Sequence, residues 1–264
     1  MNFSFANDYK YCTVRIEIID NQVNLLGSGT GFYFDITNGD NTKSFVITNK
    51  HVVKGANRGR FQIHRANEDG SINPSNTAGL YLENFESHWI MHPDKHVDLA
   101  AYPLPDYVRQ AKGSQINPFI RTFSSEMIPS EYELQELNSI ENIFMVGYPN
   151  SLWDEHHKLP IIRHGITATD PKIKFNWKNE FVIDCACFPG SSGSPVIIYK
   201  QEINKYDSPV KIFLAGILYA GPMRTSTGEI SIKEIPARQE LQAEFRMPIN
   251  LGYVISSKEL LAFI

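Results

Sequence analysis

The stretch FPGSSGSPV, residues 188–196, decides the fold class of this 264-residue chain. It is a turn rich in glycine and serine, and it separates two runs of residues typical of β-strands. Gly190 and Gly193 permit backbone conformations that other residues avoid, so amide N–H groups can converge beside a serine hydroxyl. A turn of this kind can expose a nucleophile next to an oxyanion-binding site.

Two distant stretches supply the groups that such a serine needs. A serine hydroxyl is a poor nucleophile at neutral pH, so it requires a base to take its proton and a carboxylate to fix the tautomer of that base. His51 ends the strand-like run FVITNKH, and Asp98 begins the run DLAAYPL. The chain order His, Asp, Ser is the chymotrypsin-like order and differs from those of subtilisin and α/β-hydrolases.

Three segments that carry these residues, TNKHVV, VDLAAY and DCACFPGSSGSPV, resemble the signature blocks of trypsin-like serine proteases. The resemblance is closest to the bacterial HtrA-type branch. GYPN at 147–150 and RHGITA at 163–168 are similar to segments that this branch carries between Asp and Ser. The similarity spans about residues 25 to 255.

The resemblance implies an all-β fold of two antiparallel six-stranded β-barrels, with the active site between them. It implies a serine endopeptidase that forms an acyl-enzyme and needs no cofactor. Ser192 is then the nucleophile, His51 the general base, and Asp98 the orienting carboxylate. The amides of Gly190 and Ser192 form the oxyanion hole.

Ser191 and Ser194 depart from the family pattern, which often has Asp or Asn before the nucleophile and Gly two residues after it. The first departure removes the acidic group that extracellular trypsins pair with a newly cut N-terminus. No IVGG-like activation sequence precedes the first strand. We therefore expect control by a regulatory protein partner, by homo-oligomerisation, or by the polar excursion at residues 221–247. Too few residues follow Leu260 for a PDZ domain.

The offset from Ser192 predicts the residues of the primary substrate pocket. Ala186 and Cys187 should lie at its base, and Ala220, Gly221 and Leu251 should line its walls. None of them is acidic, whereas a buried Lys or Arg side chain would need an opposing charge. The sequence therefore predicts a small or medium apolar residue at the cleavage position.

Composition gives no sign of nucleic-acid or membrane partners, and the resemblance implies a polypeptide substrate. The formal charge is −4 and the pI is near 6.1, so no basic field favours nucleic acid or an anionic membrane. No apolar run approaches a membrane span, and the N-terminus lacks a signal-peptide pattern. The three cysteines, Cys12, Cys185 and Cys187, do not form a secreted disulfide framework or a metal pattern. They favour a reducing, cytoplasmic location, with a bacterial origin implied by the resemblance.

The chain divides into an N-terminal barrel at 1–104, a linker at 105–129, and a C-terminal barrel at 130–264 that ends in a short helix. Ser130 and Glu133 predict a capping box that opens one helical turn. Strand-like runs predicted in the two halves are GFYFDI, SFVITN, RFQIHR, NIFMVGY, PIIRHGITAT, KIKFNW, EFVIDCACF, SPVIIYK and VKIFLAGILY. The stretch NEDGSINPSN is typical of a turn.

Other interpretations compete with the enzymatic one. A catalytically inactive binding module would keep the fold, and an esterase would use the same three residues on small esters. The pairs His92 with His96 and His156 with His157 are better explained as solvated loop residues than as metal ligands. The aromatic run at 32–34 and Phe45 are predicted to lie in the barrel core or on its surface.

Overall fold

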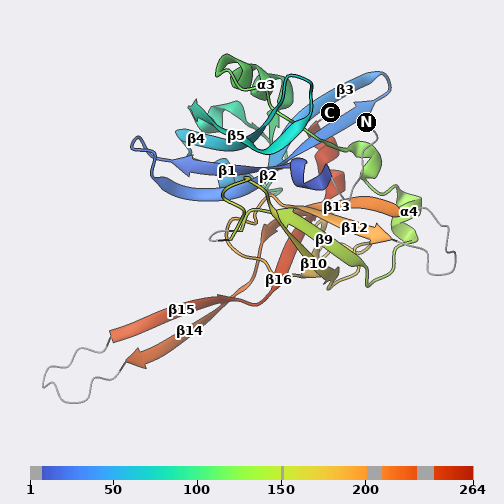
Figure 1. Cartoon of the computed structure of the whole chain (residues 1–264). Coiled ribbons are helices and arrows are strands. Elements are labelled where there is room, and N and C mark those ends of the chain that lie inside the picture. The colour runs from blue at the N-terminus through green and yellow to red at the C-terminus, as the bar shows by residue number, and fades with distance from the viewer. Residues whose placement is uncertain (1–7, 150–151, 201–209, 231–240, 264) are drawn as a thin grey trace, which may run out of the picture.

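The N-terminal half of the chain is an extended β-sheet. A computed structural model describes residues 8–149, 152–200, 210–230 and 241–263. Its first sheet has eight strands, in the order β5-β4-β1-β2-β3-β7-β6 with β8 paired to β2 (Figure 1). Their bounds are Thr13–Ile19 for β1, Leu25–Asn38 for β2, Asn41–Thr48 for β3, Arg58–Ala66 for β4, Ile72–Glu83 for β5, Ile90–Met91 for β6, Ala100–Pro103 for β7 and Phe123–Ser124 for β8.

The C-terminal half is a closed barrel of six antiparallel strands, in the order β10-β11-β16-β13-β12-β9. The bounds are Asn142–Gly147 for β9, Ile161–Thr167 for β10, Glu180–Asp184 for β11, Pro195–Lys200 for β12, Lys211–Ala220 for β13 and Leu251–Ser256 for β16. Together with the first sheet, this barrel confirms the predicted all-β fold of the chymotrypsin-like double-barrel type.

Two details of the strand prediction were wrong. The stretch NEDGSINPSN, residues 67–76, was predicted as a turn, but β5 already begins at Ile72 and pairs with β4. KIKFNW does not form a strand, because Asn176 and Trp177 have φ of 49° and 68° and close a tight turn bridged by Phe175 and Lys178. Within the described residues the first sheet therefore has eight strands instead of six, and the C-terminal barrel has six strands without KIKFNW.

The helices are short and lie between strands. They are α2 at Lys50–Val53, α3 at Leu104–Gly113 and α4 at Glu131–Gln135, with 3-10 turns η1 at Tyr9–Tyr11, η2 at Phe85–His88, η3 at Ser125–Met127 and η4 at Ser257–Phe263. The predicted capping box opens α4, and the predicted terminal helix is the 3-10 helix η4. None of the helices within the described residues has the length and apolar character needed to cross a membrane.

Three clusters of buried apolar side chains hold the fold together, one in each half and one between them. The middle cluster joins Phe32, Phe34 and Ile47 of the first sheet to Val146 and Ile197 of the barrel. Burial of apolar surface is the main favourable term in folding, so this cluster fixes the two halves against each other. The aromatic residues predicted for the core, Phe32, Tyr33, Phe34 and Phe45, are all buried.

A hairpin interrupts the barrel between β13 and β16. Strands β14 at Met223–Ile230 and β15 at Leu241–Pro248 pair antiparallel along their whole length and project away from the barrel (Figure 1). The hairpin occupies the excursion predicted at 221–247, and its tip lies outside the described residues. It leaves and re-enters the barrel next to Gly221 and Leu251, two of the predicted pocket residues.

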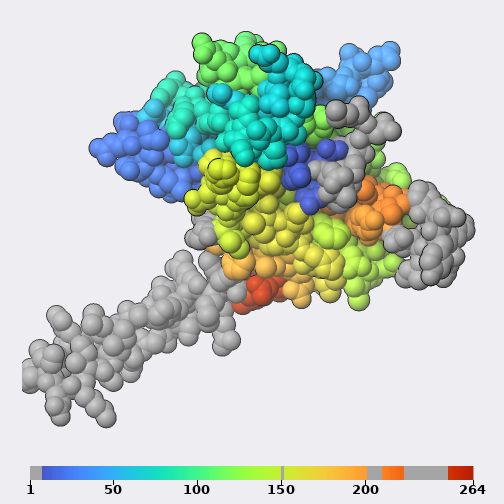
Figure 2. All heavy atoms as spheres, in the orientation of Figure 1, coloured from blue at the N-terminus to red at the C-terminus, as the bar shows by residue number. Residues whose placement is uncertain are grey.

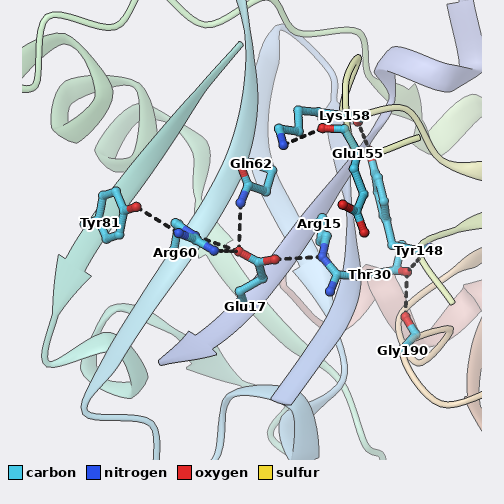
Figure 3. A network of polar contacts seen from close by, with 10 residues as sticks. All are labelled: Arg15, Glu17, Thr30, Arg60, Gln62, Tyr81, Tyr148, Glu155, Lys158 and Gly190. Carbon is cyan, nitrogen blue, oxygen red and sulfur yellow. Dashed lines mark hydrogen bonds and ion pairs between the residues drawn. The ribbon is translucent and has the colours of Figure 1, made fainter. Parts of the chain in front are cut away.

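A buried charge network lies within the first sheet, next to the loop that precedes β10 (Figure 3). Glu17 accepts hydrogen bonds from Arg15, Arg60 and Gln62. Burial alone would raise the pKa of Glu17, but these hydrogen bonds outweigh it and lower the pKa. The Arg15 guanidinium lies 4.6 Å from the Trp153 ring, so the loop sits against the sheet (Figure 2).

Candidate active site

His51 lies in the single helical turn α2, directly after strand β3. The buried side chain of Asn49, at the N-terminal boundary of this turn, donates a hydrogen bond of 2.8 Å from Nδ2 to the Asp98 carbonyl. Val52, in the same turn, packs on β2, where a Cβ added to Gly29 would lie 2.6 Å from Val52 Cγ1. The turn that carries His51 is therefore fixed on one side to the segment of Asp98 and on the other to β2.

His51 and Asp98 form a hydrogen-bonded pair. The ring Nδ1 of His51 lies 2.5 Å from Asp98 Oδ2, and the backbone N–H of His51 donates to Asp98 Oδ1 at 3.1 Å. An ionised carboxylate only accepts hydrogen bonds, so the ring donates from Nδ1 and keeps the lone pair on Nε2. The His51 side chain is about half exposed, and Nε2 makes no hydrogen bond to any described residue. This nitrogen is available as a base.

In the glycine-serine turn at 188–194, some backbone N–H groups donate hydrogen bonds to carbonyls of the described residues and others do not. The N–H groups of Ser191, Gly193 and Ser194 donate to the carbonyls of Phe188, Leu218 and Ser191, respectively. Within the described part of the chain, the N–H groups of Gly190 and Ser192 have no acceptor. Both glycines of the turn have the left-handed conformation, with φ of 89° at 190 and 87° at 193. The two unused amides are those predicted for the oxyanion hole, and they can bind an anionic oxygen.

The serine turn lies against the strands that lead to His51. The Ser192 carbonyl accepts a hydrogen bond of 2.8 Å from the N–H of Thr30 in β2. A Cβ added to Gly193 would meet the Thr30 carbonyl and lie 2.6 Å from Thr48 Oγ1, at the end of β3. The structure therefore places Ser192 beside the segment that carries His51. Within the described residues there is no hydrogen bond between Ser192 Oγ and His51, so that contact of the predicted triad is not formed here.

Thr30 connects the two halves of the site and was not predicted from the sequence (Figure 3). Its buried hydroxyl donates to the Gly190 carbonyl at 3.0 Å and accepts from the Tyr148 N–H at 3.0 Å. Its own carbonyl accepts from Thr48 Oγ1 at 2.7 Å. Thr30 thus holds the peptide group next to a predicted oxyanion amide, so we assign it as a positioning residue.

Thr30→Val should lower kcat for peptide cleavage at least tenfold while KM changes little, because the Gly190 peptide loses its anchor. It should also lower the free energy of unfolding by about 1–3 kcal/mol, since a buried carbonyl and a buried N–H lose their partner. Thr30→Ser keeps the hydroxyl and should restore kcat. Steady-state kinetics and urea unfolding of the two variants measure both effects. A Val variant with wild-type kcat would show that the hydroxyl has no positioning role.

The two serines that depart from the family pattern are fully buried, unlike Ser192. The hydroxyls of Ser191 and Ser194 have no hydrogen-bond partner among the described residues. A Cβ added to Gly147 would overlap Ser194 Oγ and lie 2.7 Å from Thr30 Oγ1, so the glycine at this position makes room for both hydroxyls. Ser191 and Ser194 are therefore part of the packing beneath the turn.

Three of the five predicted pocket residues lie close together. A Cβ added to Gly221 would lie 3.0 Å from the Leu251 carbonyl and 3.7 Å from Cys187 Cβ. Ala220 pairs with Tyr253 on the adjacent strand β16. Ala186 is half-buried, and its carbonyl accepts a hydrogen bond of 2.5 Å from Nη1 of Arg163. The sequence did not point to this arginine as part of the region.

The three cysteines and His92 are buried in the fold. All three cysteines are buried free thiols, and burial raises the pKa of Cys187 to about 12. The interpretation of His92 as a solvated residue was wrong, because its ring is buried and accepts a hydrogen bond from the Asp94 N–H. No group of three or more His, Cys, Asp or Glu is placed to hold a metal within the described ranges.

The fold and this arrangement define the class of chymotrypsin-like serine peptidases. The family model described as the trypsin-like peptidase domain matches residues 29–202, which is more than half of the chain. The chain therefore belongs to the trypsin-like peptidase family, and it is a serine protease. The matched range includes His51, Asp98 and Ser192.

Several solved structures are similar to this chain over most of its length. The inactive form of the Rv3671c protease of M. tuberculosis is 16% identical to this chain. The match covers 96% of this chain and 86% of that protease, with a TM-score of 0.43. The active form of the same protease is 15% identical, and the match covers 96% of this chain and 78% of that protease with a TM-score of 0.42. A serine protease of human pathogenic astrovirus is 12% identical, and the match covers 94% of this chain and 90% of that protease with a TM-score of 0.41. Similarities of this size carry no inference about the site.

Proposed function

We propose that this protein is a serine endopeptidase in which Ser192 attacks the carbonyl carbon of a peptide bond. His51 takes the hydroxyl proton on Nε2, and Asp98 stabilises the resulting imidazolium. The free amides of Gly190 and Ser192 bind the oxyanion of the tetrahedral intermediate. His51 then gives the proton to the leaving amine, an acyl-enzyme forms on Ser192, and water hydrolyses it by the same route.

The observation that carries this proposal is the 2.5 Å contact between His51 Nδ1 and Asp98 Oδ2, which fixes the tautomer that a general base needs. The unused amides on both sides of Ser191 support it. The missing bond between Ser192 and His51 does not oppose it, since catalytic hydrogen bonds in substrate-free sites often tighten only when substrate binds.

The prediction of an apolar residue at the cleavage position depends on the absence of an acidic group among the predicted pocket residues. The same absence excludes Lys and Arg at that position. Arg163 strengthens that exclusion, because its charge would repel a basic side chain at the pocket base. The apolar preference itself stays a prediction.

Covalent labelling tests the proposed function. A fluorophosphonate probe should label the wild-type protein, and mass spectrometry of the digest should place the adduct on Ser192. Ser192→Ala should lose both labelling and cleavage of a peptide library. Ser194→Ala, which removes a neighbouring buried hydroxyl, is the matched control and should still be labelled.

The outcomes separate the three candidate functions. Labelling together with peptide cleavage supports the endopeptidase. Turnover of small esters without cleavage of any polypeptide would favour the esterase. A folded wild-type protein that neither reacts with the probe nor cleaves peptides would be an inactive binding module, and the proposal would fail.

A further inference from the structure

Arg163 lies on β10 and points into the C-terminal barrel. Its neighbours along the strand, Ile162 and His164, are exposed, while Arg163 itself is partly buried. Side chains alternate between the two faces of a strand, so Arg163 shares the inner face with Gly165. A Cβ added to Gly165 would lie 2.8 Å from Cys185 Cβ, one residue before Ala186. This face of β10 is therefore directed toward the segment predicted to form the pocket base.

The guanidinium reaches that segment and contacts it with one of its three nitrogens. Nη1 donates a hydrogen bond of 2.5 Å to the Ala186 carbonyl. Cys185 and Cys187 flank Ala186 along the chain, and both are buried. Cys187 in turn packs near Gly221, one of the predicted walls. Arg163 is thus in direct contact with the predicted base of the primary pocket.

The other edge of the guanidinium has no partner. Nε and Nη2 are buried and make no hydrogen bond to any described residue. Nor does any carboxylate in the described ranges form an ion pair with Arg163. The two nearby thiols do not supply an anion, because burial raises the pKa of both. A buried cation with unpaired donors is unfavourable, so a complementary group is needed.

The geometry of the two unpaired nitrogens indicates which chemical group would complement them. Nε–H and an Nη2–H point in parallel along one edge of the planar guanidinium, and this edge binds the two oxygens of a carboxylate. Because Nη1 is held by the Ala186 carbonyl, the edge is already oriented. We propose that Arg163 makes the primary pocket selective for an acidic residue at the cleavage position. This inference rests on the proposed endopeptidase function.

Matched peptides test the inference in the full-length protein. A library cleaved by the wild type, with Ser192→Ala as background, first supplies a flanking sequence. Four fluorogenic peptides then differ only in Glu, Gln, Leu or Lys before the scissile bond. We expect kcat/KM for Glu to exceed that for Gln by about 10- to 100-fold, the value of a hydrogen bond to a charged group expressed as a rate ratio. The Lys peptide should be cleaved most slowly.

Arg163→Gln removes the charge but keeps a donor for the Ala186 carbonyl, and it should bring the Glu to Gln ratio close to one. Arg109→Gln is the matched control, because Arg109 is an exposed arginine paired with Asp106 on α3, and its loss should leave the ratio unchanged. A merely structural role for Arg163 would lower kcat/KM for all four peptides equally.

Two results would overturn the inference, and they are distinguishable. If the wild type is labelled on Ser192 and prefers Leu or Gln over Glu, the inference is wrong and the endopeptidase function stands. If the wild type is neither labelled nor active on any peptide, the function itself fails, and the inference with it. Should Arg163→Gln not fold, the wild-type ratio of Glu to Gln still decides between these outcomes.

Discussion

Asp98→Asn should lower kcat for peptide cleavage by about 10⁴-fold at neutral pH and leave KM nearly unchanged. The amide oxygen can still accept the His51 backbone N–H that now donates to Oδ1. The amide nitrogen, however, replaces Oδ2 and donates to the ring Nδ1. The imidazole then carries its proton on Nε2 and cannot accept the one on Ser192.

Asp94→Asn is the control for the loss of charge. Asp94 lies in the same loop, and its carboxylate accepts the N–H of His96 without contact to His51. Its variant should retain wild-type kinetics in the same peptide assay. If Asp98→Asn keeps activity within tenfold of the wild type, Asp98 does not orient the base, and the catalytic role assigned to it is wrong.

Gly193→Ala should cause the largest combined loss of stability and activity. The residue has φ of 87°, and the new methyl group would overlap the Thr30 carbonyl. The backbone conformation costs about 1–2 kcal/mol for a residue with a Cβ, and overpacking adds about 1–3 kcal/mol. The turn must shift to relieve the overlap, and a shift of about 1 Å at the adjacent Ser192 can cost about 100-fold in rate.

Gly39→Ala separates the two causes. Gly39 also has a positive φ, of 58°, but a Cβ there meets nothing within 4 Å. It should therefore show only the backbone cost in urea unfolding and no loss of kcat. Equal effects of the two substitutions on kcat would show that the contact with Thr30 does not hold Ser192 in place.

The sequence predicted the parts of the site that have a local signature. The glycine-serine turn, the histidine after a strand and the aspartate before one each have a recognisable neighbourhood, and the structure brings His51 and Asp98 together. Thr30 has no such signature, since its bond to Gly190 joins residues 160 positions apart. Arg163 opens the family-like segment RHGITA, but nothing in that segment indicates a contact with Ala186. Their roles come from tertiary packing.

The errors in the strand prediction have local causes. KIKFNW alternates as a strand does, but Asn176 and Trp177 take the left-handed turn that Asn favours, and they place the Trp177 side chain in solvent. The residues of β5 are mostly polar at their start and contain a proline, which are turn signals. Pairing with β4 overrides them. The domain limits and the cytoplasmic location stay predictions.

The hydroxyl of Thr30 spans from the first sheet to the serine turn and to Tyr148. His51 and Asp98 belong to one half of the chain, and the serine turn with Gly190 and Ser192 belongs to the other. Under the proposed function, cleavage activity therefore appears only once the second half of the chain has folded against the first.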